Sequence, residues 1–124
     1  RKGDPIVFLG WEPHPMNANF EMTYLTGGDD WFGPNLGGAT VYTNTSAGYV
    51  EACPNVGKLL QNLEFTLAME NEIMGAILND GEKPEAAAAA WLAAHPDVLT
   101  PWLDGVTTRD GGDAMAAVKS ALGL

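Results

Sequence analysis

Apolar residues follow two different patterns along the chain, and the change between them comes near residue 45. In the first part, short apolar or alternating runs stand between loops rich in Gly, Pro and Asn, which is typical of β-strands joined by turns. The apolar run at residues 6–9 is the first predicted strand, and the alternating run at 21–25 is the second. A third strand is predicted at 40–43, after a long glycine-rich loop at 27–38.

From residue 46 onward the spacing of the apolar residues is helical. Ser46 can act as the N-cap of a short helix that ends at residue 52, because Pro54 cannot continue it. Asn55 can cap the next helix. The apolar residues of that helix, at positions 56, 59, 60 and 63, would lie on one face.

Two of the remaining helices have sequence signals at their ends. Met and Ile residues recur at helical spacing from 69 to 78 and stop at an Asn-Asp-Gly sequence, which is a good C-terminal signal. Pro84 suits the first turn of the alanine-rich helix that follows, at 85–94. This helix is predicted to end at His95, since a residue before proline is disfavoured in a helix. Two more helices are predicted, at 96–103 and 110–122.

Short strands followed by several helices indicate a mixed α/β fold. The three predicted strands make a poor sheet by themselves. No hairpin turn such as Asn-Gly joins them, and the first part of the chain has no full βαβ alternation. We therefore interpret this part as a piece of a larger sheet whose partner strands lie elsewhere.

Composition narrows the class of protein. The chain has 124 residues, of which 46% are hydrophobic and 18% charged, so a globular domain is expected. Sixteen acidic residues against six Lys and Arg give a net charge of -10, which argues against nucleic acid as a partner. No apolar run approaches the roughly 20 residues that span a bilayer. Because the sequence opens at Arg1 rather than Met, we expect a processed or truncated chain.

The most distinctive candidate site is the sequence Trp-Glu-Pro-His-Pro, which begins where the first predicted strand ends. Ligands of α/β proteins bind outside the carboxyl ends of strands, so Trp11 could present its ring as the wall of a binding site. A packed loop aromatic is the alternative. Glu12 and His14 could act as an acid–base pair or as half of a metal site, but no third ligand or base is found at a suitable spacing.

The other candidates favour ordinary structural roles. Cys53 has no partner for a disulfide and no nearby base, and we expect a small buried thiol. The adjacent acids of the glycine-rich loop lack the calcium-loop pattern and are expected to be solvated. Trp91 and Trp102 lie among Ala, Leu and Val and are predicted to anchor the core. No metal site, cofactor motif or catalytic constellation is predicted.

Three stretches resemble a known family: VFLGWEPHPMNANFEMTYLTGGDDWFGPN, GGATVYTNT and MENEIMGAILNDGEKPEAAAAAWLAAHPDVLTPWLDGV. They are similar to the C-terminal part of the substrate-binding proteins of glycine betaine/choline ABC transporters, above all to periplasmic choline-binding proteins. The resemblance runs over essentially the whole chain. The Gly-Trp-Glu-Pro-His stretch is its most specific motif, and the alanine-rich helix is a weaker one.

The resemblance implies part of a type II periplasmic binding protein, in which two α/β lobes close on a ligand. Residues 1–18 would end the second lobe, and residues 19–124 would form a crossover and the C-terminal part of the first lobe. Trp11 matches the one aromatic box position that this part of the family carries, whereas Trp31, Trp91 and Trp102 match none. The implied ligand is choline or a related quaternary amine, and the implied partners are a membrane permease and the N-terminal remainder of the protein.

Two other functions remain open from the residues. The chain could be an interaction or dimerisation module without a small-molecule site, because unpaired strand edges recruit other chains. An enzyme that uses Glu12 and His14 as acid and base comes third, since it needs a further residue that the sequence does not supply.

Overall fold

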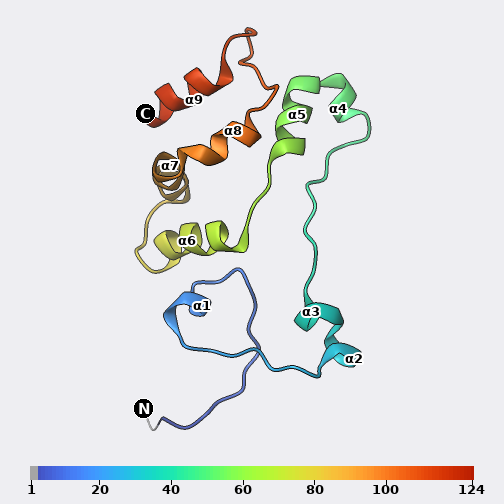
Figure 1. Cartoon of the computed structure of the whole chain (residues 1–124), viewed down its shortest axis with the longest axis vertical. Coiled ribbons are helices and arrows are strands. Elements are labelled where there is room, and N and C mark those ends of the chain that lie inside the picture. Colours follow the sequence, from blue (N-terminus) through green and yellow to red (C-terminus); the bar gives the residue numbers. More distant parts are fainter. Residues whose placement is uncertain (1–2) are drawn as a thin grey trace.

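The computed structural model describes residues 3–124, and these form nine α-helices and one 3₁₀ helix (Figure 1). The short helices α1, α2 and α3 lie at one end of the molecule, and α4 to α9 form a helical body beyond them. A long stretch without regular structure connects α3 to α4. The elements are α1 Met16–Asn19, α2 Asp29–Phe32, α3 Pro34–Gly37, α4 Tyr49–Ala52, α5 Pro54–Asn62, α6 Leu67–Leu78, α7 Pro84–Ala94, η1 Pro96–Val98, α8 Leu99–Trp102 and α9 Ala114–Leu122.

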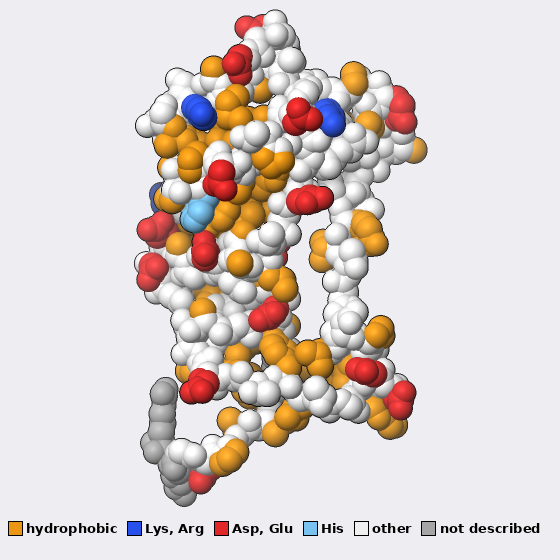
Figure 2. Space-filling view, viewed as in Figure 1, with side chains coloured by type: hydrophobic (Ala, Val, Ile, Leu, Met, Phe, Trp, Pro, Cys, Tyr) orange, Lys and Arg blue, Asp and Glu red, His pale blue; other side chains and the backbone are white. Residues whose placement is uncertain are grey.

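The three predicted strands are not formed. Residues 6–9, 21–25 and 40–43 have no regular secondary structure, and the β-type pairing within residues 3–124 is limited to an isolated bridge between Thr107 and Asp113. A strand forms only when a neighbour accepts and donates its backbone hydrogen bonds. Figure 2 shows an open gap between the stretch that links α3 to α4 and the helical body, so residues 40–43 have no such neighbour. The glycine-rich loop at 27–38, predicted to be irregular, holds the single turns α2 and α3.

The two longest helices stop where the sequence predicted, and α7 also starts there, whereas α6 begins two residues before the predicted range. The hydroxyl oxygen of Thr66 caps α6 by accepting a hydrogen bond from the backbone N–H of Met69 at 3.2 Å. This helix ends at Leu78, and Gly81 then takes a positive φ of 75° that favours glycine. Pro84 opens α7, which stops before His95. Local signals were enough here because a helix satisfies its own backbone hydrogen bonds.

Two predicted caps are wrong. Ser46 does not cap α4 with its side chain: the helix begins at Tyr49, after Gly48 in a left-handed conformation. Asn55 lies inside α5, which begins at Pro54. The Asn55 side chain instead bonds with the backbone of Thr107, donating to its carbonyl at 2.8 Å and accepting from its N–H at 2.9 Å. A tertiary contact therefore replaced the local cap, as Asn side chains allow.

The C-terminal helices also differ from the predicted ranges. The helix expected at 96–103 divides into η1 and α8. The last helix, expected from residue 110, begins only at Ala114, with the Asp113 carboxylate accepting from the backbone N–H of Ala116 at 3.0 Å. The preceding residues close a tight turn in which the N–H of Thr108 donates to the carbonyl of Gly112 at 3.0 Å. That turn takes the residues that the pattern assigned to the helix.

The most buried apolar residues all belong to the helical body. They come from α6, α7, α8 and α9 respectively: Met69, Ala87, Leu99 and Ala114. Trp91 and Trp102, predicted to be core anchors, lie half-buried beside this core, and the Trp102 ring packs against Phe65 with centroids 5.5 Å apart. Among residues 3–124, no helix is both long enough and apolar enough to cross a membrane.

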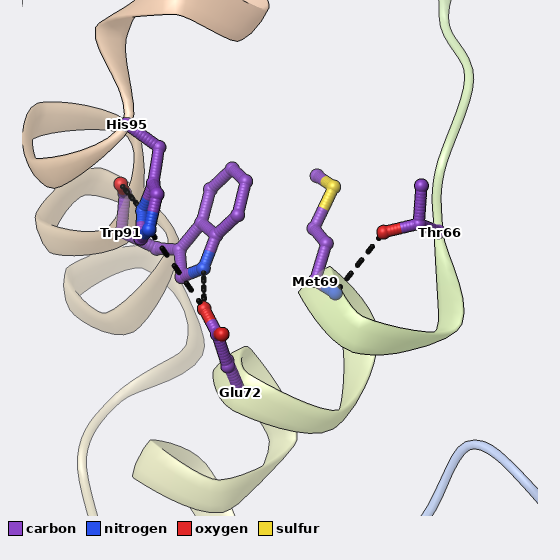
Figure 3. Close-up of polar contacts among 5 residues, drawn as sticks. All are labelled: Thr66, Met69, Glu72, Trp91 and His95. Carbon is purple, nitrogen blue, oxygen red and sulfur yellow. Dashed lines mark hydrogen bonds and ion pairs between the residues drawn. The ribbon is translucent and has the colours of Figure 1, made fainter.

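A polar cluster joins α6 to α7 (Figure 3). The indole N–H of Trp91 donates to the carboxylate of Glu72 at 2.6 Å, and the Nε2 atom of His95 lies 4.0 Å from the same carboxylate oxygen. The Trp91 and His95 rings stack with centroids 4.2 Å apart. This cluster fixes the two helices against each other.

Candidate functional site

The Trp11 loop, residues 10–15, lies beside α6 and carries the candidate side chains. The Trp11 side chain is 56% exposed and Glu12 is also exposed, while Pro15 is buried. The His14 ring meets the Trp11 ring edge-on, with centroids 5.4 Å apart and an angle of 73° between the planes. The Trp11 ring is therefore supported on one side and remains accessible to a ligand.

His14 anchors the loop to the helical body. Its backbone N–H donates to Oδ1 of Asn71, on α6, at 2.7 Å. Its Nδ1 atom accepts a hydrogen bond from the backbone N–H of Met16 at 3.1 Å, so this ring nitrogen carries no proton. One nitrogen of His14 is thus occupied in holding the start of α1.

A second set of hydrogen bonds, centred on Asn17, also holds the loop. The side-chain amide nitrogen of Asn17 donates to two backbone carbonyls, those of Trp11 and His14, each at 3.0 Å. Its Oδ1 atom accepts a hydrogen bond from the hydroxyl of Tyr24 at 3.1 Å. Sequence analysis did not single out Asn17 or Tyr24, because nothing local shows that the turn at α1 brings residue 24 back to residue 17.

Glu12 acts electrostatically on this network. Partial burial raises the pKa of Tyr24, the negative charge of Glu12 raises it further, and the hydrogen bond with Asn17 acts in the opposite direction. No hydrogen bond joins Glu12 to His14 in the described part of the chain. Across residues 3–124, no three or more His, Cys, Asp or Glu side chains gather in a way that could hold a metal ion. Within residues 3–124, the structure therefore adds no third residue to Glu12 and His14 for acid–base chemistry or metal binding.

An apolar groove of about 300 Å³ lies next to the Trp11 loop. Its walls come from residues 6–10 and 22–25 and from α2 and α3, and Trp11 is not among its lining residues. Several of the apolar side chains are highly exposed, such as Ile6 and Leu9 at 78% each. The groove therefore follows the two segments that were predicted to be strands, and it is separate from the Trp11 ring.

The remaining candidates are surface residues. Cys53 is exposed, so the prediction of a buried thiol is wrong: it stands between α4 and α5, at the exposed start of the second of these helices. Trp31 is 87% exposed on α2. The neighbouring acids Asp29 and Asp30 are exposed as expected.

Comparison with protein families matches residues 1–94 to the substrate binding domain of ABC-type glycine betaine transport systems. A glycine betaine/carnitine transport binding protein of Listeria monocytogenes is 33% identical over 109 residues, which are 88% of this chain and 35% of that protein.

Two solved structures share 74% sequence identity with the chain. One is an ABC-transporter choline binding protein in complex with choline, with a TM-score of 0.84 over 97% of this chain and 42% of that one. The other is an ABC-transporter choline binding protein in an unliganded semi-closed conformation, with a TM-score of 0.78 over 99% of this chain and 43% of that one.

The chain thus spans less than half the length of the relatives it matches. The expected family is confirmed, and the lack of strands in residues 3–124 does not conflict with it, because the aligned segments keep their overall course. The family match over residues 1–94 and the 74% identity with solved relatives show that the chain belongs to the substrate-binding domains of ABC-type glycine betaine transport systems.

Proposed function

We propose that this chain is the C-terminal portion of an ABC importer's substrate-binding protein that captures choline or a related quaternary amine. The observation that carries the proposal is the 74% identity, over 97% of the chain, with a choline binding protein solved in complex with choline. At that identity, side chains that contact a ligand in one protein are expected to recur in the other.

Trp11 is the residue proposed to contact the ligand. The face of an indole ring attracts a quaternary ammonium group by about 0.5–2 kcal/mol, depending on how far water is excluded. Trp11 offers such a face, because its side chain is 56% exposed and His14 meets it only edge-on. A tight site needs several rings, so the other walls of the box come from the portion of the protein outside this chain.

Capture by lobe closure is the proposed mechanism. Residues 1–18 would belong to the second lobe, and residues 19–124 would form the crossover and the C-terminal part of the first lobe. Closing the lobes over the ligand would exclude water and strengthen the attraction between cation and ring. No bond is made or broken. The protein would act in the periplasm and pass its ligand to a membrane permease.

The alternative, an interaction module, has one observation in its favour. The groove beside the Trp11 loop is lined by apolar side chains with exposures that a stable monomer seldom keeps. Within the proposed function, the same surface would pack against the remainder of the protein.

Isothermal titration calorimetry tests the proposed function on the complete protein. Choline is compared with 3,3-dimethylbutan-1-ol, which has the same shape but carries no charge. We expect choline to bind at least about tenfold more tightly, because only the cation gains from the rings. The 124-residue chain alone should bind choline far more weakly than the complete protein. Equal affinity for the two ligands would contradict the proposal.

A further inference from the structure

The backbone of Trp11 is held by a single side chain. The amide nitrogen of Asn17 donates to the Trp11 carbonyl and to the His14 carbonyl, each at 3.0 Å. These two carbonyls stand at the two ends of the Trp-Glu-Pro-His sequence. One amide group therefore links the two ends of this sequence and sets the position of the Trp11 backbone relative to α1.

Tyr24 holds the opposite end of that amide. The Trp11 and His14 carbonyls can only accept hydrogen bonds, so the amide nitrogen faces them, and the Tyr24 hydroxyl donates to Oδ1 at the other end at 3.1 Å. If the amide were flipped, its oxygen would oppose two carbonyl oxygens. The pair of residues thus forms a chain of hydrogen bonds that runs from the Tyr24 ring to the Trp11 backbone.

The other end of the loop is tied to the helical body. The backbone N–H of His14 donates to Oδ1 of Asn71 on α6 at 2.7 Å, and the His14 ring supports the Trp11 ring. The loop is therefore attached to α6 through His14 and to α1 through Asn17. Asn17 is the attachment that reaches Trp11 itself.

We propose that Asn17, supported by Tyr24, is a positioning residue for ligand binding: it fixes the Trp11 backbone so that the indole face meets the ligand. This inference rests on the proposed function, since it presumes that Trp11 is a wall of the site. Asn17 itself touches no ligand. The residues that contact a ligand must be held within about 0.5 Å of the productive geometry, and supporting side chains such as Asn17 hold them there.

The test uses the complete protein and four variants. Asn17→Ala removes the amide, and Asn17→Leu removes its hydrogen bonds while keeping a similar volume. Tyr24→Phe removes only the hydroxyl that donates to the amide oxygen. Asn19→Ala is the matched control: it removes the same type of side chain from the same helix, but its amide donates to Asn79 at 3.2 Å rather than to the Trp11 loop.

Two quantities are measured for each variant: the dissociation constant for choline by calorimetry, and the indole N–H signal of Trp11 by NMR, assigned from its loss in Trp11→Phe. We expect both Asn17 variants to weaken choline binding by about tenfold, because both hydrogen bonds from the amide to the loop carbonyls are lost. Tyr24→Phe should weaken it by about threefold, and Asn19→Ala by less than about twofold. The Trp11 signal should move in the Asn17 variants and stay in place in Asn19→Ala.

Each outcome decides the inference. Normal binding by Asn17→Leu would overturn it, because side-chain volume would then explain any loss in Asn17→Ala. An unmoved Trp11 signal in the Asn17 variants would also overturn it. If the unmodified protein failed to bind choline, the proposed function would fall, while the Trp11 signal would still show whether Asn17 positions the ring.

Discussion

The two ends of this chain treat their apolar residues in opposite ways. In residues 3–45, large apolar side chains stand in solvent, among them Leu9 at 78% and Val41 at 93% exposure. In the helical body, residues from four different helices close over a small core, where Leu99 is only 3% exposed. Both parts contain many large apolar residues, so the difference lies in the kind of structure that each part needs.

The comparison shows why one part of a fold persists alone and another does not. A helix makes its hydrogen bonds within its own residues and needs a neighbour only for its apolar face. A strand needs a neighbour for its backbone as well. Residues 6–9, 21–25 and 40–43 have strand-like sequences but no such neighbour in the described chain, so they stay irregular and exposed. In the proposed complete protein, the remainder of the polypeptide would supply these neighbouring strands.

A pair of leucines gives the largest expected contrast between the two parts. In the 124-residue chain, Leu99→Ala should lower the free energy of unfolding by about 2–5 kcal/mol, because it empties a buried position. Leu9→Ala should change it by less than about 0.5 kcal/mol, because this side chain is already exposed. Urea unfolding followed by far-UV circular dichroism measures both.

The same pair sharpens the comparison in the complete protein. If residues 6–9 become a paired strand there, Leu9→Ala should cost about 1 kcal/mol or more, since its side chain would then be buried. Equal effects of Leu9→Ala in the chain and in the complete protein would show that this segment gains no partner.

Two glycines test how tightly the helical body itself is packed. A Cβ atom added at Gly57 would lie 2.8 Å from Cγ1 and 3.0 Å from Cα of Val50, where α4 meets α5. Gly57→Ala should therefore destabilise the chain by about 1–3 kcal/mol. Gly75 in α6 is the matched control, because its nearest neighbour would be an Asn79 atom at 3.9 Å.

Gly75→Ala should stabilise the chain by about 0.5–1 kcal/mol, since alanine loses less backbone entropy in a helix. Thermal unfolding by circular dichroism measures the two changes, and they should have opposite signs. Shifts of the same sign would mean that α4 and α5 do not pack as closely as the structure shows.

The sequence predicted those features that depend on neighbouring residues. The C-terminal end of α6 at Leu78 and both ends of α7 followed from an Asn-Asp-Gly sequence and two prolines. The predicted strands failed because no neighbouring segment within residues 3–124 pairs with them. The cap at Asn55 failed because its side chain bonds with Thr107, more than fifty residues away.

The candidate site was predicted in part. Trp11 could be singled out because a large ring follows an apolar run, and because the family resemblance points to it. Asn17 and Tyr24 could not, because their hydrogen bonds arise only when α1 reverses the chain. The exposure of Cys53 was missed for a related reason, since burial depends on what packs against a residue and not on its type.

The central claim is that Trp11 is a wall of the ligand site, and the most direct measurement compares two tryptophans in the complete protein. Calorimetric titration with choline is carried out on Trp11→Ala and on Trp31→Ala, which removes the same ring from an exposed position on α2. The account predicts that Trp11→Ala raises the dissociation constant by about 30-fold, as the loss of a desolvated cation–π contact implies, and that Trp31→Ala changes it by less than about twofold. An unchanged dissociation constant in Trp11→Ala would contradict the account.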